Sequence, residues 1–201
     1  MFTGQGECHL SLRKFASLAC AVVLCAPLLR AESKTFVVAP DQSTVAFTLG
    51  GMVHSVHGTF SVKSGKIVFD SDNSEISGSI VVAAGSGKSG DTKRDRRMTK
   101  DVLEAGKFTG VSFAPQSLNG EIASSGKSTV QITGVFTVHG SPHELTVPVK
   151  IDIEGNKCRA ETSFLVPYVR WGMKDASTLM IKVGKEVEVN LILVGQISTG
   201  S

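Results

Sequence analysis

Apolar and polar residues alternate along most of this chain, and the pattern is clearest between Asp41 and Asp70. Val45, Phe47 and Leu49 occupy every second position there, and glycines separate this run from similar runs that follow. Alternation with a period of two predicts strands with one apolar face and one solvated face. A chain with this texture favours a closed or nearly closed antiparallel β-structure, and its interior is where we expect a function to reside.

The alternation recurs almost to the C-terminus and predicts eight or more strands. It breaks at residues 85–90, a loop of glycine and serine, and at residues 91–106, DTKRDRRMTKDVLEAG, which predict a helix. Thr99 can cap a turn in this helix and Gly106 can end it. The segment is short and highly charged, so we expect it to lie across one end of the β-structure. The predicted strands cover residues 36–38, 45–49, 53–62, 66–69, 76–83, 111–113, 129–138, 145–153, 159–166, 179–183 and 187–193.

The N-terminal region has the pattern of an export signal. The basic pair at residues 13–14 precedes an apolar run at residues 15–29, FASLACAVVLCAPLL. A basic segment followed by a short apolar one is typical of secretory signal peptides, and a membrane span needs about 20 residues. We therefore predict a signal peptide at residues 1–31, cut after Ala31, and a periplasmic or secreted domain at residues 32–201. Lipidation at Cys20 or Cys25 and an uncleaved anchor are the alternatives.

Removal of the leader changes the charge and cysteine arguments. Residues 32–201 contain 18 basic and 17 acidic residues, a net charge of +1. A nearly neutral domain argues against a nucleic-acid partner. Cys158 is then the one remaining cysteine, so no internal disulfide is expected. We favour a small buried role for Cys158 over an exposed thiol.

Several segments in a fixed order resemble one known family. They are residues 41–47, DQSTVAF; 53–70, VHSVHGTFSVKSGKIVFD; 91–113, with its Arg-Asp helix-and-strand block; 132–149, ITGVFTVHGSPHELTVPV; 167–177, PYVRWGMKDAS; and 186–189, EVEV. Over residues 35–197 the chain resembles the YceI-like family of secreted, lipocalin-like barrels that bind polyisoprenoid lipids. The resemblance implies an all-β fold, a single eight-stranded antiparallel lipocalin-like barrel with one short helical segment near residues 91–106.

The resemblance also implies a function. It predicts a non-enzymatic protein that holds an amphiphilic isoprenoid, of polyprenyl or quinone type, for storage or transport. It also implies a homodimer. We further expect no other cofactor and a transient contact with a membrane. An apolar barrel interior suits a prenyl tail, because each buried methylene contributes about 0.8 kcal/mol.

Inward-facing apolar residues on the predicted strands are the candidates for the lining of a lipid site. On any one strand the alternative is that such a residue belongs to an ordinary core. The candidate ligand-binding residues are Phe47, Phe60, Phe69, Val111, Phe113, Phe136, Val138, Phe164, Val166, Trp171 and Met173.

The charged segment offers candidates for the polar end of the ligand. Three arginines could recognise a phosphate headgroup, because one guanidinium group can donate two parallel hydrogen bonds to phosphate oxygens. They are Arg94, Arg96 and Arg97. The alternative is a salt-bridged cap over the barrel, in which Asp95 pairs with an arginine.

Two other classes of function remain as alternatives. A metal-dependent or other enzyme would use His54, His57, His139 and His143, but residues three apart on a strand face opposite ways, so His54 and His57 cannot readily share an ion. A structural or interaction module would have a solid core. We predict no catalytic residue and no metal site.

Overall fold

The computed structural model describes Met1 and residues 33–52, 54–70, 74–178 and 181–199. The predicted leader, apart from Met1, and the predicted cleavage site after Ala31 lie outside the described residues. Within the described part of the chain, no helix combines the length and the hydropathy needed to cross a membrane.

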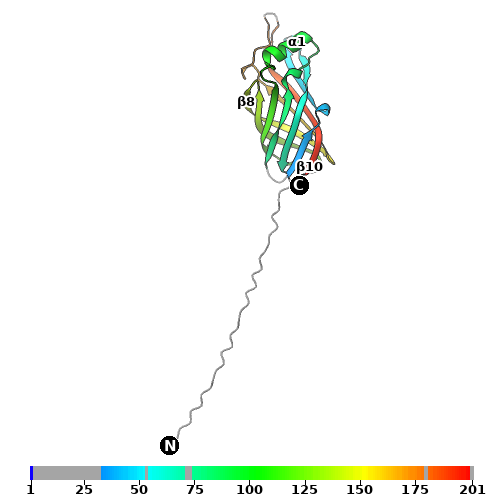
Figure 1. The fold of residues 1–201 in the computed structure, drawn as a ribbon, viewed down its shortest axis with the longest axis vertical. Helices are drawn as coiled ribbons and strands as arrows, with labels where there is room; N and C mark the ends of the chain where they lie inside the picture. The colour runs from blue at the N-terminus through cyan, green and yellow to red at the C-terminus, as the bar shows by residue number, and fades with distance from the viewer. Residues whose placement is uncertain (2–32, 53, 71–73, 179–180, 200–201) are drawn as a thin grey trace. The chain divides into compact units, whose positions relative to one another are not determined.

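The described strands form one closed antiparallel barrel of eight strand positions, as predicted (Figure 1). Two of the positions are each shared by two consecutive strands, β1 with β2 and β3 with β4. Each strand position otherwise pairs with its neighbours in chain order. The strands are β1 (Ser33–Val38), β2 (Thr44–Gly51), β3 (Val56–Phe60), β4 (Val62–Asp70), β5 (Ile76–Ala83), β6 (Gly110–Asn119), β7 (Gly126–Val138), β8 (Ser141–Glu154), β9 (Lys157–Val166) and β10 (Val183–Thr199).

The barrel closes along β10, which pairs with β9 on one side and with both β1 and β2 on the other. A 3-10 turn, η1 (Pro40–Gln42), separates β1 from β2. Ser43 bridges the interruption, since its Oγ donates to the carbonyl of Ala39 and accepts from the N–H of Val194. The sheet therefore keeps its hydrogen bonds across this break. Toward the open end the ring is less regular, since β8 pairs with β9 only at residues 150–154 and its residues 141–149 pair with β7 alone.

Antiparallel order places the connections at two opposite ends of the barrel. The open end carries the β2–β3 turn and the connections at residues 84–109, 139–140 and 167–182, with α1 among them (Figure 1). The closed end carries the shorter connections at residues 71–75, 120–125 and 155–156. We use these two names below.

The helical segment lies at one end of the barrel, as expected, but its bounds differ from the prediction. It consists of α1 (Thr92–Arg97) and one π-helical turn, η3 (Met98–Val102). Asp91 caps the helix by accepting from the N–H of Arg94. The hydroxyl of Thr99 instead donates to the carbonyl of Asp95 within the helix, so the predicted capping role for Thr99 is wrong. An aspartate before the first turn is the stronger cap.

Two strand predictions need correction. Residues 53–62 were expected to form one strand, but β3 ends at Phe60 and β4 begins at Val62, where the two strands change partners from β2 to β1. The predicted strand at residues 179–183 reaches the sheet only at Val183, and residues 179–180 lie outside the described part. Val183 begins β10, which continues through the predicted strand at residues 187–193 without a turn.

Candidate functional site

A cavity of about 800 Å³ occupies the interior of the barrel. Every second residue of β9 lines it, from Cys158 near the closed end to Val166 near the open end. The interior is therefore hollow, in contrast to the solid core that a purely structural module would have. Its volume lies within the range of about 300–1,000 Å³ that is usual for ligand sites.

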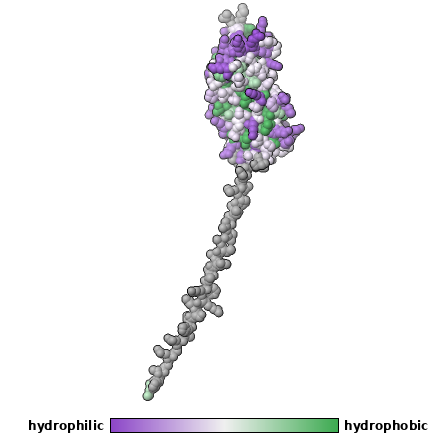
Figure 2. Space-filling model, in the orientation of Figure 1, coloured by the Kyte–Doolittle hydropathy of each residue, from purple (hydrophilic) through white to green (hydrophobic). Residues whose placement is uncertain are grey.

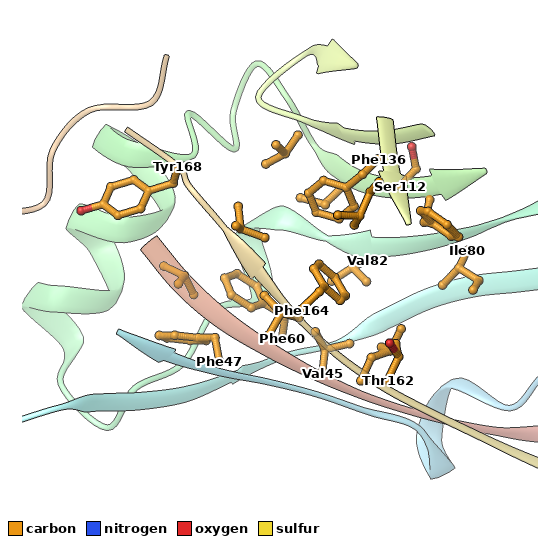
Figure 3. A pocket seen from close by; sticks show the side chains of 18 of the residues that line it. Val45, Phe47, Phe60, Ile80, Val82, Ser112, Phe136, Thr162, Phe164 and Tyr168 are labelled. Carbon is orange, nitrogen blue, oxygen red and sulfur yellow. The ribbon is translucent and has the colours of Figure 1, made fainter. Parts of the chain in front are cut away.

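Four phenylalanines from different strands surround the middle of the cavity (Figure 3). Phe47 on β2 packs against Phe60 on β3 with ring centroids 5.4 Å apart. Phe136 on β7 packs edge-on against Phe164 on β9 with centroids 5.7 Å apart. Their rings present a broad apolar surface without a polar group, which a hydrocarbon chain can contact along its length.

Glycine at position 58 makes room for one of these rings. A Cβ built on Gly58 would lie 2.4 Å from the Phe47 ring and 2.4 Å from the carbonyl of Lys88. The backbone of β3 can therefore approach residues 84–90 closely, and Thr59 and Lys88 exchange backbone hydrogen bonds of 2.8 and 2.9 Å.

Ten of the eleven predicted lining residues lie at the cavity wall. Whether they bind a ligand stays a prediction. The prediction omitted many other wall residues, such as Val45, Ile80 and Leu191, although they follow the same alternation. The ten are Phe47, Phe60, Phe69, Val111, Phe113, Phe136, Val138, Phe164, Val166 and Met173.

Trp171 lies outside the set of lining residues. Its ring stacks on His143, with centroids 4.0 Å apart and an interplanar angle of 7°, and lies 5.9 Å from the ring of Phe136. It therefore backs the wall rather than forming it. Trp171 belongs to the connection at residues 167–182, where no strand alternation indicates which way a side chain points.

The four charged residues among those that line the cavity all belong to the open end. They are Asp91, Lys93, Arg94 and Arg97, on or beside α1. Apart from Cys158 and Thr162 on β9, the described lining residues away from the open end are apolar, and many of them are buried, for example Phe69, Ile76 and Ile122. The cavity wall is thus apolar along most of its length and charged at the open end.

The arginines do not form a salt-bridged cap. Arg94 donates to the hydroxyl and the carbonyl of Ser89 at 2.7 and 2.8 Å, and Arg97 donates to the carbonyl of Ser177 at 2.9 Å. Asp95 accepts from the N–H and hydroxyl of Ser89 rather than from an arginine. Arg96 is exposed and does not line the cavity, so of the three headgroup candidates two lie at the open end of the cavity itself.

Asp91 offsets only part of this positive charge. Its pKa lies below the usual value, chiefly because the carboxylate accepts from the N–H of Arg94, so it is ionised at neutral pH. Lys93, Arg94 and Arg97 outnumber it, and the open end of the cavity favours an anionic or polar group.

Tyr168 fixes the connection at residues 167–182 against the barrel. Its buried hydroxyl donates to the carbonyl of Gly184 at 3.0 Å and accepts from the N–H of Ala176 at 3.2 Å. Burial raises the pKa of this phenol. The hydroxyl is occupied by the backbone, so it serves to position the open end.

Two polar side chains face the interior away from the open end. Cys158 is buried, as predicted, and burial raises its pKa to about 11. Thr162 lies four residues further along β9 on the same face, and its buried Oγ1 has no hydrogen-bond partner among the described residues. Neither group is activated for nucleophilic chemistry.

The histidines have separate surroundings. His57 shares a hydrogen bond of 3.0 Å with Thr48, and His139 lies 3.3 Å from Glu104. His143 stacks on Trp171. Across the described residues, no group of three histidine, cysteine or carboxylate side chains is placed to hold a metal ion.

Comparison with known proteins gives both a family and a fold. The family model for the YceI-like domain matches residues 36–194. Burkholderia cenocepacia BcnA has a similar structure, with a TM-score of 0.64, 21% identity, and coverage of 79% of this chain and 99% of that one. A polyisoprenoid-binding domain from Saccharophagus degradans, implicated in plant cell wall breakdown, matches with a TM-score of 0.59, 12% identity, and coverage of 82% and 98%.

The Campylobacter jejuni YceI protein is also similar, with a TM-score of 0.53, 14% identity, and coverage of 66% of this chain and 80% of that one. No protein of curated function is significantly similar in sequence. Identities this low establish the shared barrel and carry no residue-level role.

Proposed function

This chain belongs to the family of YceI-like domains, and we propose that it is an exported binding protein that holds an amphiphilic isoprenoid lipid inside its barrel. The tail, of polyprenyl or quinone type, lies in the apolar cavity. The polar end lies at the open end, beside Arg94 and Arg97. The protein stores or transports the lipid and does not transform it.

The polarity of the cavity is the observation that carries this proposal. A ligand that is apolar over most of its length and polar at one end matches a cavity whose charged lining residues gather at one end. A wholly apolar ligand would place no polar or anionic atom beside Arg94 and Arg97, and a compact polar ligand would leave the apolar part of the cavity empty. One of the similar solved structures is a polyisoprenoid-binding domain, which supports an isoprenoid among the amphiphiles.

The energetics favour a tail that fills most of the cavity. Each buried methylene contributes about 0.8 kcal/mol, and ordering a flexible chain offsets part of that gain. A long tail that is partly ordered therefore gives useful affinity without exceeding the ceiling of about −18 to −21 kcal/mol seen for non-covalent complexes.

Extraction from the native host tests the proposal most directly. We expect protein purified without detergent to release an isoprenoid lipid into organic solvent, detected by mass spectrometry, in about one copy per barrel. Native mass spectrometry of the same sample measures the bound mass and whether the barrel is a homodimer. An empty barrel that also fails to take up added prenyl lipid would contradict the proposal.

The one tryptophan of the chain provides a second assay. Trp171 backs the cavity wall through Phe136, so a quinone in the cavity should quench its fluorescence. Ala160 lines the cavity, and the larger side chain of Ala160→Phe should fill part of that space. The affinity for decylubiquinone, measured by titrating the quenching, should then fall at least ~10-fold. Ala46→Phe on the outer face of β2 is the matched control, and equal affinities for the two variants would place the ligand outside the barrel.

A further inference from the structure

The two ends of the barrel carry opposite charge. At the open end, the connection at residues 84–109 has seven basic and four acidic residues, and that at residues 167–182 has three basic and one acidic residue. At the closed end, the described residues of the connections, 74–75, 120–125 and 155–156, include two acidic residues and no basic one. The near-neutral domain therefore has a strongly positive end, over which hydrophilic residues gather in Figure 2.

The carboxylates of the open end do not neutralise its cations by direct pairing. Asp91 caps α1, Asp95 binds Ser89, and Asp175 accepts from the N–H of Ser177. Glu104 lies beside His139. Of the lysines and arginines in this end, all of which the structure describes, none lies within 4.0 Å of a carboxylate oxygen.

Two large apolar side chains project from the same end. Met52 is 83% exposed and Ile181 is 64% exposed. They come from different connections that meet in space, since the N–H of Met52 donates to the carbonyl of Lys182 at 3.4 Å. Ile181 also lines the cavity, so this apolar pair stands at its entrance.

We propose that the open end docks on an anionic lipid bilayer, with Met52 and Ile181 inserted between headgroups and the surrounding lysines and arginines on the lipid phosphates. Proteins that bind at a membrane interface combine exposed apolar residues, which insert between the headgroups, with a basic surface, which attracts the anionic lipids. An acidic protein partner would also match the positive charge. The exposed apolar pair, Met52 and Ile181, lies beside the cavity entrance and favours a bilayer instead. A bilayer would also let a lipid tail enter the barrel without crossing water. This inference rests on the proposed function for its purpose, although the docking surface stands on its own residues.

Flotation of lipid-stripped protein with vesicles tests the docking. We expect binding to vesicles of phosphatidylcholine mixed with phosphatidylglycerol, little binding to phosphatidylcholine alone, and loss of binding at about 1 M salt, where the screening length falls to about 3 Å. Arg96→Glu with Lys182→Glu should weaken binding at least ~10-fold, since each cation near an anionic surface adds measurably to affinity. The control, Lys63→Glu with Lys66→Glu on β4, makes the same change in net charge on exposed side chains of the barrel wall and should bind like the wild type.

The apolar contribution has its own pair of variants. Met52→Ser with Ile181→Ser should reduce binding to the mixed vesicles several-fold, about as expected for two exposed side chains that insert partly. Val37→Ser removes an apolar side chain that is 48% exposed on β1, in the half of the barrel toward the closed end, and should have no effect. Because all these positions are exposed, circular dichroism should show unchanged folding.

The outcomes separate this inference from the proposed function. Uptake of decylubiquinone from solution without vesicle binding would overturn the docking and leave the lipid-binding role intact. Vesicle binding by a barrel that takes up no prenyl lipid would support the docking and contradict the proposed function. Equal binding to both kinds of vesicle, or equal effects of the open-end and wall variants, would overturn the docking.

Discussion

The closed and open ends of the barrel are built on different physical principles. The closed end joins its strands by short connections and fills the space between them with buried apolar side chains such as Leu118, Ile122 and Ile153. The open end uses two long connections, of which the one at residues 84–109 holds charged residues at the cavity and the one at residues 167–182 is fixed by hydrogen bonds such as those of Tyr168. The charged lining residues are therefore confined to the open end, although that end also has a buried apolar cluster of its own, which includes Val102, Phe136 and Met173.

This division resolves a conflict that every hollow barrel has. A cavity of about 800 Å³ lacks the side-chain packing contacts that would otherwise stabilise the interior of the barrel. A densely packed closed end can offset part of this loss without narrowing the entrance, because its buried side chains contribute to the stability of the whole domain. Substitutions at the closed end should therefore change stability, and substitutions at the open end should change ligand selection.

Leu118→Ala should have the largest effect on stability. Leu118 is 4% exposed, belongs to the closed end and does not line the cavity. Its truncation should lower the free energy of unfolding by about 2–5 kcal/mol, measured by urea titration. The affinity for decylubiquinone should stay unchanged under folding conditions.

The exposed Leu165 provides the matched control for this variant. Leu165→Ala should cost no more than about 0.5 kcal/mol. A large loss of affinity in Leu118→Ala would show that the two ends are coupled, against the division argued above.

Replacement of the arginines at the open end should change selectivity rather than folding. Arg94→Gln with Arg97→Gln removes two guanidinium groups that line the cavity. We expect the preference for geranylgeranyl phosphate over geranylgeraniol to fall about 10-fold or more, because a charge-assisted hydrogen bond contributes about 1.5–3 kcal/mol. Competition with decylubiquinone in the Trp171 assay measures both ligands.

Arg96→Gln is the control, because Arg96 belongs to the same helix but does not line the cavity. The same loss of selectivity in Arg96→Gln would indicate a diffuse electrostatic effect and would contradict a headgroup site at Arg94 and Arg97.

Tyr168→Phe should have a smaller effect, confined to the open end. The variant leaves the carbonyl of Gly184 and the N–H of Ala176 without their partner. We expect a loss of about 1–2 kcal/mol in unfolding free energy. Hydrogen exchange should accelerate at Ala176 and not at the closed-end residue Leu118, and uniform acceleration would contradict a local role.

The sequence was sufficient to predict the barrel and most of its inner face. Period-two alternation at positions such as Phe47 and Phe164 predicts which side chains share a face, and a closed antiparallel sheet turns that face inward. Alternation does not reveal whether inward side chains meet across the barrel or leave a cavity between them. That outcome depends on strand tilt and on the volume of all inward residues together.

The open end was the part that sequence reasoning predicted least well. Thr99 and Trp171 lie in connections without periodicity, where side-chain directions depend on tertiary hydrogen bonds such as that from Arg97 to the carbonyl of Ser177. The break between β3 and β4 was missed for a related reason. It reflects a change of partner strand that leaves the local pattern of apolar residues unaltered.

An effect of similar size, confined to alkaline pH, concerns the buried thiol near the closed end. Burial, and to a lesser extent the charge of Asp152, raises the pKa of Cys158 from about 9 to about 11. Below pH 9 the thiol is protonated in both the folded and the unfolded chain and has no effect. Between these values the unfolded chain releases the proton more readily, so stability falls as the pH rises.

Comparison with Cys158→Ala isolates this contribution, because Tyr168 and the lysines titrate in both proteins. The difference in unfolding free energy between wild type and variant should shrink by about 1–2 kcal/mol between pH 8 and pH 11, measured by urea titration. A difference that does not change with pH would mean that solvent reaches Cys158, which lines the cavity toward the closed end. That part of the cavity would then be wet, and the contrast between an apolar inner part and a charged open end would lose its physical basis.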